Sequence, residues 1–169
     1  MGLIVAIGLY FVVVALAYCF QRDLLYFPDQ QPMIDAPSGF FYVEPRIAPD
    51  GSPYRSLFKR PSDDSRPIIL HLHGNGGSIT GRMPIYQAMT SEGAGLLAVG
   101  YPGYGGNPQK PSEQLMYDVA QSNFSHLIEM GFAPERIVIV GQSLGTGIAT
   151  KLAVDNSAAG LILEAAYTG

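Results

Sequence analysis

Residue types that build disulfides, metal sites and nucleic-acid surfaces are scarce in this chain. It has one cysteine, Cys19, no tryptophan and three histidines among 169 residues. A single cysteine excludes an intramolecular disulfide framework and a cysteine-rich zinc site. Ten Lys and Arg stand against 14 Asp and Glu, a net charge of −4, and the basic residues form no cluster that could neutralise a run of phosphates. We therefore expect no nucleic-acid partner, no metal and no cofactor.

Charged residues are also few, at 14% of the chain against about 25% in an average soluble domain. Apolar residues make up 47% of the chain, which excludes intrinsic disorder. The apolar excess is concentrated in the first twenty residues. The rest has the length of one domain, since domains most often have about 100 to 150 residues. We expect one soluble domain behind an apolar N-terminal segment.

The N-terminal segment from Leu3 to Phe20 contains 18 residues and no charge. A helix of this length is about 27 Å long, which just spans the hydrocarbon core of a bilayer. We expect residues 1–20 to be a single-pass transmembrane anchor that places the protein at a membrane, on a side that the flanking charges do not decide. The alternative is a cleavable signal peptide, which Ala15 and Ala17 favour as a cleavage site. The absence of Lys or Arg before the apolar run opposes that alternative.

Residues 21–39 contain three prolines, which predict an irregular juxtamembrane linker. The domain is expected over residues 40–169, where strand and helix patterns alternate. Runs that are apolar at nearly every position indicate strands covered on both faces, which is typical of a parallel sheet between two layers of helices. We predict an α/β fold that starts with an antiparallel pair. The expected strands are 40–47, 54–58, 68–72, 95–99, 136–140 and 161–164, and the expected helices are 81–91, 112–131 and 144–154.

Glycine-rich turns follow three of the expected parallel strands and first suggest phosphate binding. The spacing does not fit, because Gly74 and Gly76 lack a third glycine at position 79, and the turn at 141–148 has no lysine. The same turn matches G-x-S-x-G at Gly141, Ser143 and Gly145. A strand running into a helix through this turn is the setting of a nucleophilic serine, so Ser143 is the predicted nucleophile. The alternative is a glycine-rich turn with an N-capping serine.

A nucleophilic serine needs backbone N–H groups that stabilise the negative charge on the substrate oxygen. We expect this oxyanion hole to consist of the N–H groups of Leu144 and Asn75, with Gly76 as the alternative to Asn75. His73 is expected to anchor the glycine-rich loop rather than to act as a base. His71 is expected in the core and His126 on a helix surface.

Three motifs occur in a fixed order: HLHGNGG at 71–77, VGYPGYGG at 99–106 and VIVGQSLGTGIA at 138–149. They resemble the α/β-hydrolase superfamily, and more narrowly its membrane-anchored abhydrolase-domain serine hydrolases, in which a motif similar to RDLLYFP at 22–28 follows the N-terminal helix. The resemblance implies an α/β-hydrolase fold and esterase, thioesterase or lipase activity through an acyl-enzyme on Ser143. The substrate would be a small-molecule acyl ester or thioester. Tyr101 and Tyr104 match a loop that shapes the site wall in such proteins.

The pattern departs from this family after Ser143. The remaining 26 residues contain Asp155 and Glu164 but no histidine, whereas the family carries its acid and its base there. We therefore expect a C-terminally incomplete hydrolase domain, truncated after about the sixth strand and inactive alone. Two alternatives remain: a catalytically inactive hydrolase fold that serves as a binding or interaction module, and an unrelated α/β domain that binds a small anion.

Overall fold

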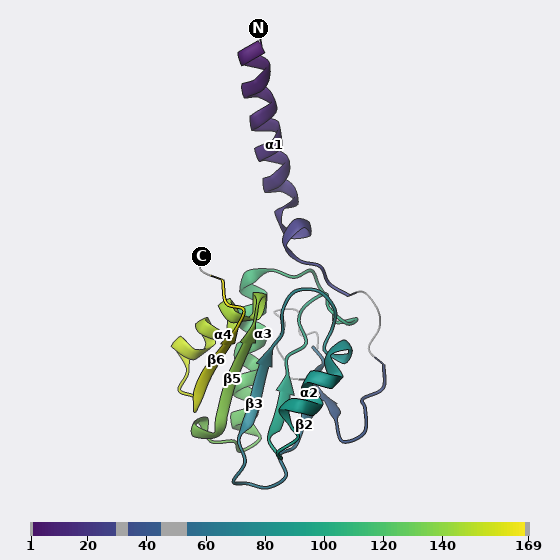
Figure 1. The fold of residues 1–169 in the computed structure, drawn as a ribbon, viewed down its shortest axis with the longest axis vertical. Helices are drawn as coiled ribbons and strands as arrows, with labels where there is room; N and C mark the ends of the chain where they lie inside the picture. The colour runs from purple at the N-terminus through teal and green to yellow at the C-terminus, as the bar shows by residue number, and fades with distance from the viewer. Residues whose placement is uncertain (1, 30–33, 45–53, 168–169) are drawn as a thin grey trace.

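The computed structural model describes residues 2–29, 34–44 and 54–167. It shows a long N-terminal helix that extends away from a helix-covered sheet (Figure 1). The sheet has six strands in the order β1-β2-β4-β3-β5-β6. The strands are β1 (Phe41–Val43), β2 (Ser56–Lys59), β3 (Ile68–Leu72), β4 (Gly95–Ala98), β5 (Ile137–Gln142) and β6 (Gly160–Glu164).

The sheet is mostly parallel, as the continuous apolar runs predicted. β1 pairs antiparallel with β2, and β2 pairs antiparallel with β4. β4, β3, β5 and β6 then run parallel, with Leu70 of β3 opposite Leu97 on one side and Ile139 on the other. The predicted antiparallel start is therefore confirmed. β1 covers only Phe41–Val43 of the first expected strand at 40–47, and residues 45–47 lie outside the described residues.

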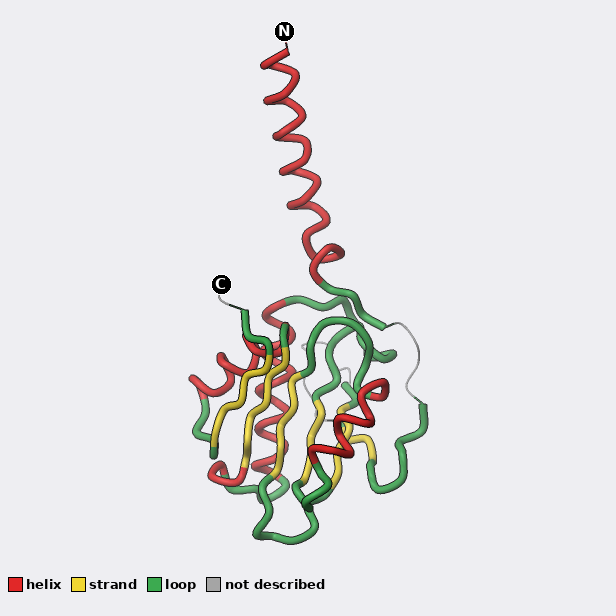
Figure 2. Tube along the Cα trace, viewed as in Figure 1, coloured by secondary structure: helices red, strands yellow, loops and turns green. Residues whose placement is uncertain are grey.

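Helices cover both faces of the sheet (Figure 2). Successive residues of β4 point to opposite faces. Leu97 packs with residues of α3 and α4, whereas Leu96 and Ala98 pack with Tyr86 of α2. The helices are α2 (Met83–Met89), α3 (Glu113–Glu129) and α4 (Leu144–Asp155), with short 3-10 turns at η1 (Thr80–Arg82) and η2 (Pro134–Arg136).

Ser112 marks the start of α3 as the sequence predicted. Its side-chain oxygen accepts a hydrogen bond from the N–H of Leu115 at 3.3 Å, which satisfies one of the free donors of the first turn. Gly131, with a φ of +91°, follows the end of the helix. A positive φ carries little penalty in glycine, so this residue can turn the chain away from the helix axis.

The N-terminal helix α1 (Gly2–Leu25) is longer than the expected anchor. It runs to Leu25 rather than ending near Phe20, because residues 21–25 contain no helix breaker and include Leu, Arg and Gln, which favour helix. None of its residues is buried, and its most apolar stretch of 18 residues has a mean hydropathy of 2.7. Within the described part of the chain, α1 is the one helix that is long and apolar enough to cross a membrane.

Candidate active site

Ser143 occupies a strained turn between β5 and α4. Its backbone has φ +47° and ψ −114°, a conformation that non-glycine residues rarely adopt. The residue is exposed, and its hydroxyl makes no hydrogen bond within the described part of the chain. Its side chain does not cap the helix that follows. An N-capping serine would bond to that helix, so the observed geometry favours an exposed nucleophile over a capping residue.

Two glycines make this turn sterically possible. A Cβ on Gly145 would lie 2.0 Å from the carbonyl oxygen of Leu72, because the start of α4 packs directly on the end of β3. A Cβ on Gly141 would lie 2.7 Å from the carbonyl oxygen of Gly145. Both distances are far below van der Waals contact, so any side chain at these positions would displace the turn. The spacing of the G-x-S-x-G motif is thus a packing requirement.

The glycine-rich loop at residues 73–77, which we call the oxyanion loop after its expected role, lies against Ser143. A Cβ on Gly74 would lie 3.3 Å from the Cβ of Ser143. Leu144 is the first residue of α4, so its N–H has no acceptor within the helix. The N–H of Gly76 is already bonded to the side-chain oxygen of Asn75, at 2.9 Å. This bond removes Gly76 as a donor and favours Asn75 as the second member of the oxyanion pair.

Arg82 holds the oxyanion loop in place, a role that the sequence did not reveal. Its guanidinium donates to the carbonyl oxygens of Gly74 at 3.1 Å and Gly76 at 2.7 Å, and to the side-chain oxygen of Gln142 at 3.2 Å. One side chain therefore ties this loop to the residue before Ser143. The available signal was a lone arginine just after a glycine loop, but its partner Gln142 is 60 residues away in sequence.

Tyr101 and Tyr104 lie beneath the oxyanion loop, and the structure does not place them in the expected site wall. Both are buried, and neither lines the cavity beside Ser143. The Tyr101 hydroxyl donates to the carbonyl oxygen of His73 at 3.0 Å, and the Tyr104 hydroxyl donates to the side-chain oxygen of Asn75 at 2.7 Å. Burial raises the pKa of Tyr104 to about 12, so its hydroxyl remains a donor at neutral pH. These tyrosines support the loop from below.

The histidines do not form a base for Ser143. His73 is fully buried, its ring stacks 4.1 Å from Tyr101, and its Nδ1 lies 2.8 Å from the carbonyl oxygen of Gly74. Burial lowers the pKa of His73 to about 3 and that of His71 to about 4. His126 lies on α3 beside Glu129. The expected anchoring role of His73 agrees with its contacts.

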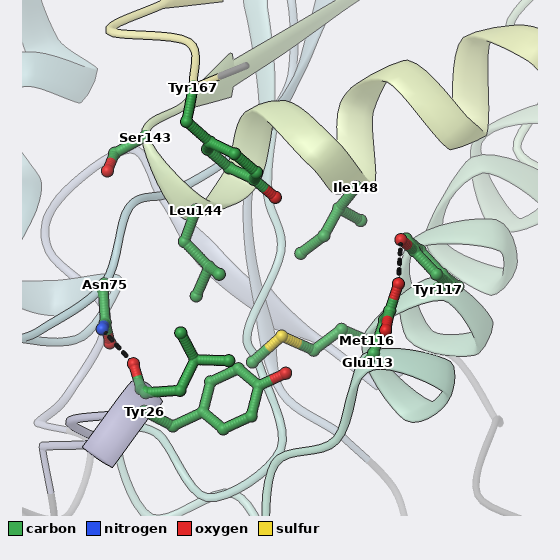
Figure 3. A pocket seen from close by; sticks show the side chains of 10 residues that line it. Tyr26, Asn75, Glu113, Met116, Tyr117, Ser143, Leu144, Ile148 and Tyr167 are labelled. Atoms are coloured by element: carbon green, nitrogen blue, oxygen red, sulfur yellow. Dashed lines mark hydrogen bonds between the residues drawn. The ribbon is translucent and has the colours of Figure 1, made fainter. Parts of the chain in front are cut away.

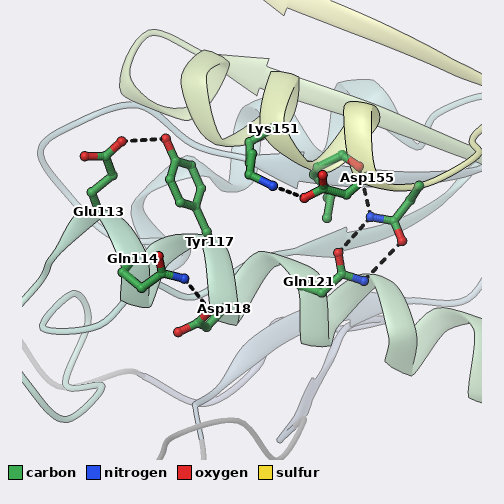
Figure 4. A network of polar contacts seen from close by, with 9 residues as sticks. Glu113, Gln114, Tyr117, Asp118, Gln121, Lys151 and Asp155 are labelled. Carbon is green, nitrogen blue, oxygen red and sulfur yellow. Dashed lines mark hydrogen bonds and ion pairs between the residues drawn. The ribbon is translucent and has the colours of Figure 1, made fainter.

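The two carboxylates after Ser143 have other partners. Asp155 lies near the end of α4 and pairs with Lys151, close to the contact between α3 and α4 (Figure 4). Glu164 ends β6 and accepts a hydrogen bond from Gln142 at 3.3 Å. The described residues thus place Ser143 beside the glycine-rich loop, but they bring no histidine–carboxylate pair to it. They also contain no group of three or more His, Cys, Asp or Glu that could hold a metal.

A cavity of about 420 Å³ opens beside Ser143 (Figure 3). This volume lies within the ~300–1,000 Å³ range of small-molecule sites. Its wall is mainly apolar and comes from distant parts of the chain, including the end of the N-terminal helix. The lining residues are Leu25, Tyr26, Asn75, Glu113, Met116, Tyr117, Ser143, Leu144, Ile148 and Tyr167.

Comparison with known proteins finds relatives that include an uncharacterized protein and a named lipase. No protein-family model matches the chain. An uncharacterized protein of Mycobacterium tuberculosis is 34% identical over 154 residues, which cover 88% of this chain and 54% of the relative. The lysophosphatidylserine lipase ABHD12 of Danio rerio is 35% identical over 97 residues, 56% of this chain and 25% of the lipase. The chain thus spans about half the length of the Mycobacterium relative and less of the lipase.

A solved structure agrees with these relatives. An α/β hydrolase from Vibrio vulnificus superposes with a TM-score of 0.62 at 27% identity, over 73% of this chain and 44% of that protein. Its fold matches the six-stranded, mostly parallel sheet described above. The strained backbone of Ser143 between β5 and α4 and the glycines around it agree with what these relatives indicate. The chain belongs to the α/β-hydrolase superfamily.

Proposed function

We propose that this chain is the nucleophile-bearing part of a membrane-anchored serine hydrolase that cleaves acyl esters or thioesters through an acyl-enzyme on Ser143. The observation that carries the proposal is the backbone of Ser143, held at φ +47° with its hydroxyl exposed beside the oxyanion loop. Backbone strain of this kind persists where the surrounding structure enforces it, and it is concentrated at functional sites.

The chemistry follows from the position of the hydroxyl. The Ser143 oxygen attacks the carbonyl carbon of the substrate while its proton passes to a general base. The carbonyl oxygen gains a negative charge, which the N–H groups of Leu144 and Asn75 stabilise. The intermediate then expels the alcohol or thiol, which takes up that proton, and leaves the acyl group on Ser143. Attack by water releases the carboxylic acid and restores the serine.

The general base has to come from outside the 169 residues in this proposal. His71 and His73 are buried with lowered pKa values, and Asp155 pairs with Lys151 on α4. We therefore expect a histidine and its orienting carboxylate to be supplied by further chain, and the 169-residue chain to be inactive alone. This expectation agrees with relatives about twice as long as the region matched.

The substrate is expected to carry an apolar acyl group. The cavity beside Ser143 is lined by Leu25, Met116, Leu144 and Ile148, which suit an acyl chain better than a charged group. One similar protein is named as a lysophosphatidylserine lipase, and its substrate has an acyl ester. An ester or thioester with one acyl chain is the class we propose.

We further propose that α1 is retained as a membrane anchor. α1 is the one described helix that is long and apolar enough to cross a membrane, and no Lys or Arg precedes its apolar run, which opposes a cleavable signal peptide. Carbonate extraction of membranes that contain the protein should leave it in the pellet. Recovery of the intact protein in the supernatant, or of a form that begins near residue 18, would contradict the anchor.

The test of the function is hydrolysis of a short p-nitrophenyl ester by the protein expressed from its complete coding sequence, in detergent. Ser143→Ala should lower kcat by at least about 10³-fold, because the oxyanion hole and binding alone give only a small residual rate. The matched control is Ser157→Ala, which removes an exposed hydroxyl after the end of α4. Full activity in Ser143→Ala would place the nucleophile elsewhere. No activity in the wild-type protein would favour a catalytically inactive binding module.

A further inference from the structure

The segment that leaves α1 is attached to the oxyanion loop. Residues 25–29, which we call the strap, connect the N-terminal helix to the domain. The side-chain N–H of Asn75 donates to the carbonyl oxygen of Leu25 at 2.5 Å, and the N–H of Phe27 donates to the side-chain oxygen of Asn75 at 3.0 Å. The amide of Asn75 is thus held from both sides by backbone groups of the strap.

The same side chain joins the strap to its own loop and to the core. Its oxygen also accepts from the N–H of Gly76 at 2.9 Å and from the hydroxyl of Tyr104 at 2.7 Å. Three donors therefore converge on one amide oxygen, and the fourth bond leaves from the amide nitrogen. A side-chain amide that is held by four hydrogen bonds orients the backbone of its own residue.

The strap is itself held by the domain. The Tyr26 side chain is 8% exposed and belongs to the main hydrophobic core. The carbonyl oxygen of Asp29 accepts a hydrogen bond from the N–H of Gly105 at 2.8 Å. Leu25 and Tyr26 line the same cavity as Ser143 (Figure 3). The strap is therefore a packed element of the site and not a loose tether.

We infer that the strap is a positioning element of the active site, which sets the oxyanion loop through the side chain of Asn75. The inference rests on the proposed function, since it assigns the backbone N–H of Asn75 to the oxyanion hole. Its consequence is that the anchor segment contributes to the chemical step as well as to location. Loss of an oxyanion donor lowers kcat by about 10² to 10³-fold, and loss of its support should cost a part of that.

The test compares two variants of Phe27 in the protein expressed from its complete coding sequence. Phe27→Pro removes the N–H that bonds Asn75, whereas Phe27→Ala keeps this N–H and removes the same side chain, which is 61% exposed. Because Pro28 follows, residue 27 is already biased to the extended backbone that proline accepts. We expect kcat on a short soluble ester to be about 10-fold lower in Phe27→Pro than in Phe27→Ala. KM should differ less between the two.

A second arm separates positioning from loss of stability. Asn75→Ala removes the side-chain link, so adding Phe27→Pro to it should lower kcat no further. Tyr104→Phe removes the hydroxyl that contacts both the side-chain oxygen of Asn75 and the backbone N–H of Phe27, while it leaves the backbone of the strap unchanged, and we expect it to lower kcat as well. If Phe27→Pro lowers the thermal unfolding midpoint, Tyr104→Phe replaces it as the variant that tests the positioning of Asn75. Equal kcat in Phe27→Pro and Phe27→Ala, additive losses in the double variant, or wild-type kcat in Tyr104→Phe would overturn the inference.

The outcome for Ser143→Ala keeps the two proposals apart. If Ser143→Ala retains activity, the proposed function fails and the strap has no oxyanion hole to position. If Ser143→Ala is inactive while Phe27→Pro equals Phe27→Ala, only the role of the strap is overturned. The short soluble ester is essential, because a substrate delivered from the membrane would also respond to the orientation of the anchor.

Discussion

The backbone geometry of the candidate site depends on a few single residues. Ser143 at a positive φ needs small neighbours on both sides, and the motif supplies Gly141 and Gly145. These residues were predictable because a local turn geometry constrains a short stretch of sequence. The side-chain roles of Asn75 and Arg82 were not predictable. The Phe27 partner of Asn75 lies 48 residues away and the Gln142 partner of Arg82 lies 60 residues away, so only the folded chain brings these pairs together.

Gly145 should be the least replaceable glycine of the motif. In Gly145→Ala the new methyl group would meet the carbonyl of Leu72, which belongs to a central strand and has no room to move. We expect a loss of about 1–3 kcal/mol or more in unfolding free energy, seen as a lower thermal midpoint. Gly81→Ala is the matched control, because no atom lies within 4 Å of the added Cβ. Equal midpoints in the two variants would contradict the packing described for the elbow.

The buried histidines predict an acid-sensitive fold. Burial lowers the pKa of His73 to about 3 and that of His71 to about 4, whereas both titrate near 6.5 in the unfolded chain. The unfolded state therefore binds more protons below pH 6.5, so stability is full above this pH and falls as the pH drops toward 4. Each histidine can add up to ~1.4 kcal/mol per pH unit to this fall. His71→Gln should make the thermal midpoint less dependent on pH between 6.5 and 4.5, and an unchanged dependence would argue against this origin.

At the level of elements, the pattern of apolar residues predicted the parallel strands and the helices that cover them. β3 has the predicted bounds, and α3 follows its expected N-cap at Ser112. The end of α1 was harder to predict, because residues 21–25 favour helix although the charge-free run ends before them. The burial of Tyr26 in the domain was not predicted, since an aromatic residue in a linker fits a membrane interface equally well.

The edge strand β6 is an exposed apolar surface. It pairs with β5 on one side, and its other edge has no partner strand among the described residues. Leu161, Ile162 and Leu163 are 39%, 55% and 41% exposed, and no charge interrupts them. Open edges of this kind pair with other chains. The 169-residue chain should therefore aggregate when it is expressed alone.

A lysine on this strand should reduce that aggregation. Ile162→Lys places a charge on the exposed edge strand, and we expect a larger monomeric fraction of the 169-residue chain in detergent by light scattering. The matched control is Val154→Lys, because Val154 is 78% exposed near the end of α4, away from the sheet edge. An equal gain from both variants would indicate a general effect of charge and would contradict a role of the β6 edge.

The whole molecule combines a long apolar N-terminal helix, a strap and a sheet whose carboxyl edge carries Ser143. α1 joins the domain at this edge (Figure 1), and Leu25 at its end lines the same cavity as Ser143. The superfamily could be predicted from the order of three motifs, and the similarity to known hydrolases agrees with it. The contact between the N-terminal helix and the candidate active site could not be predicted. It depends on hydrogen bonds between backbone groups of the strap and the side-chain amide of Asn75.

The most direct test of the central claim is the site of covalent labelling. The protein expressed from its complete coding sequence is treated with a fluorophosphonate in detergent, digested and examined by peptide mass spectrometry, beside the 169-residue chain. We predict a single adduct on Ser143 in the complete protein and none in the 169-residue chain, which brings no base to this serine. An adduct on any other serine of the complete protein, or no adduct at all, would contradict the assignment of Ser143 as the nucleophile.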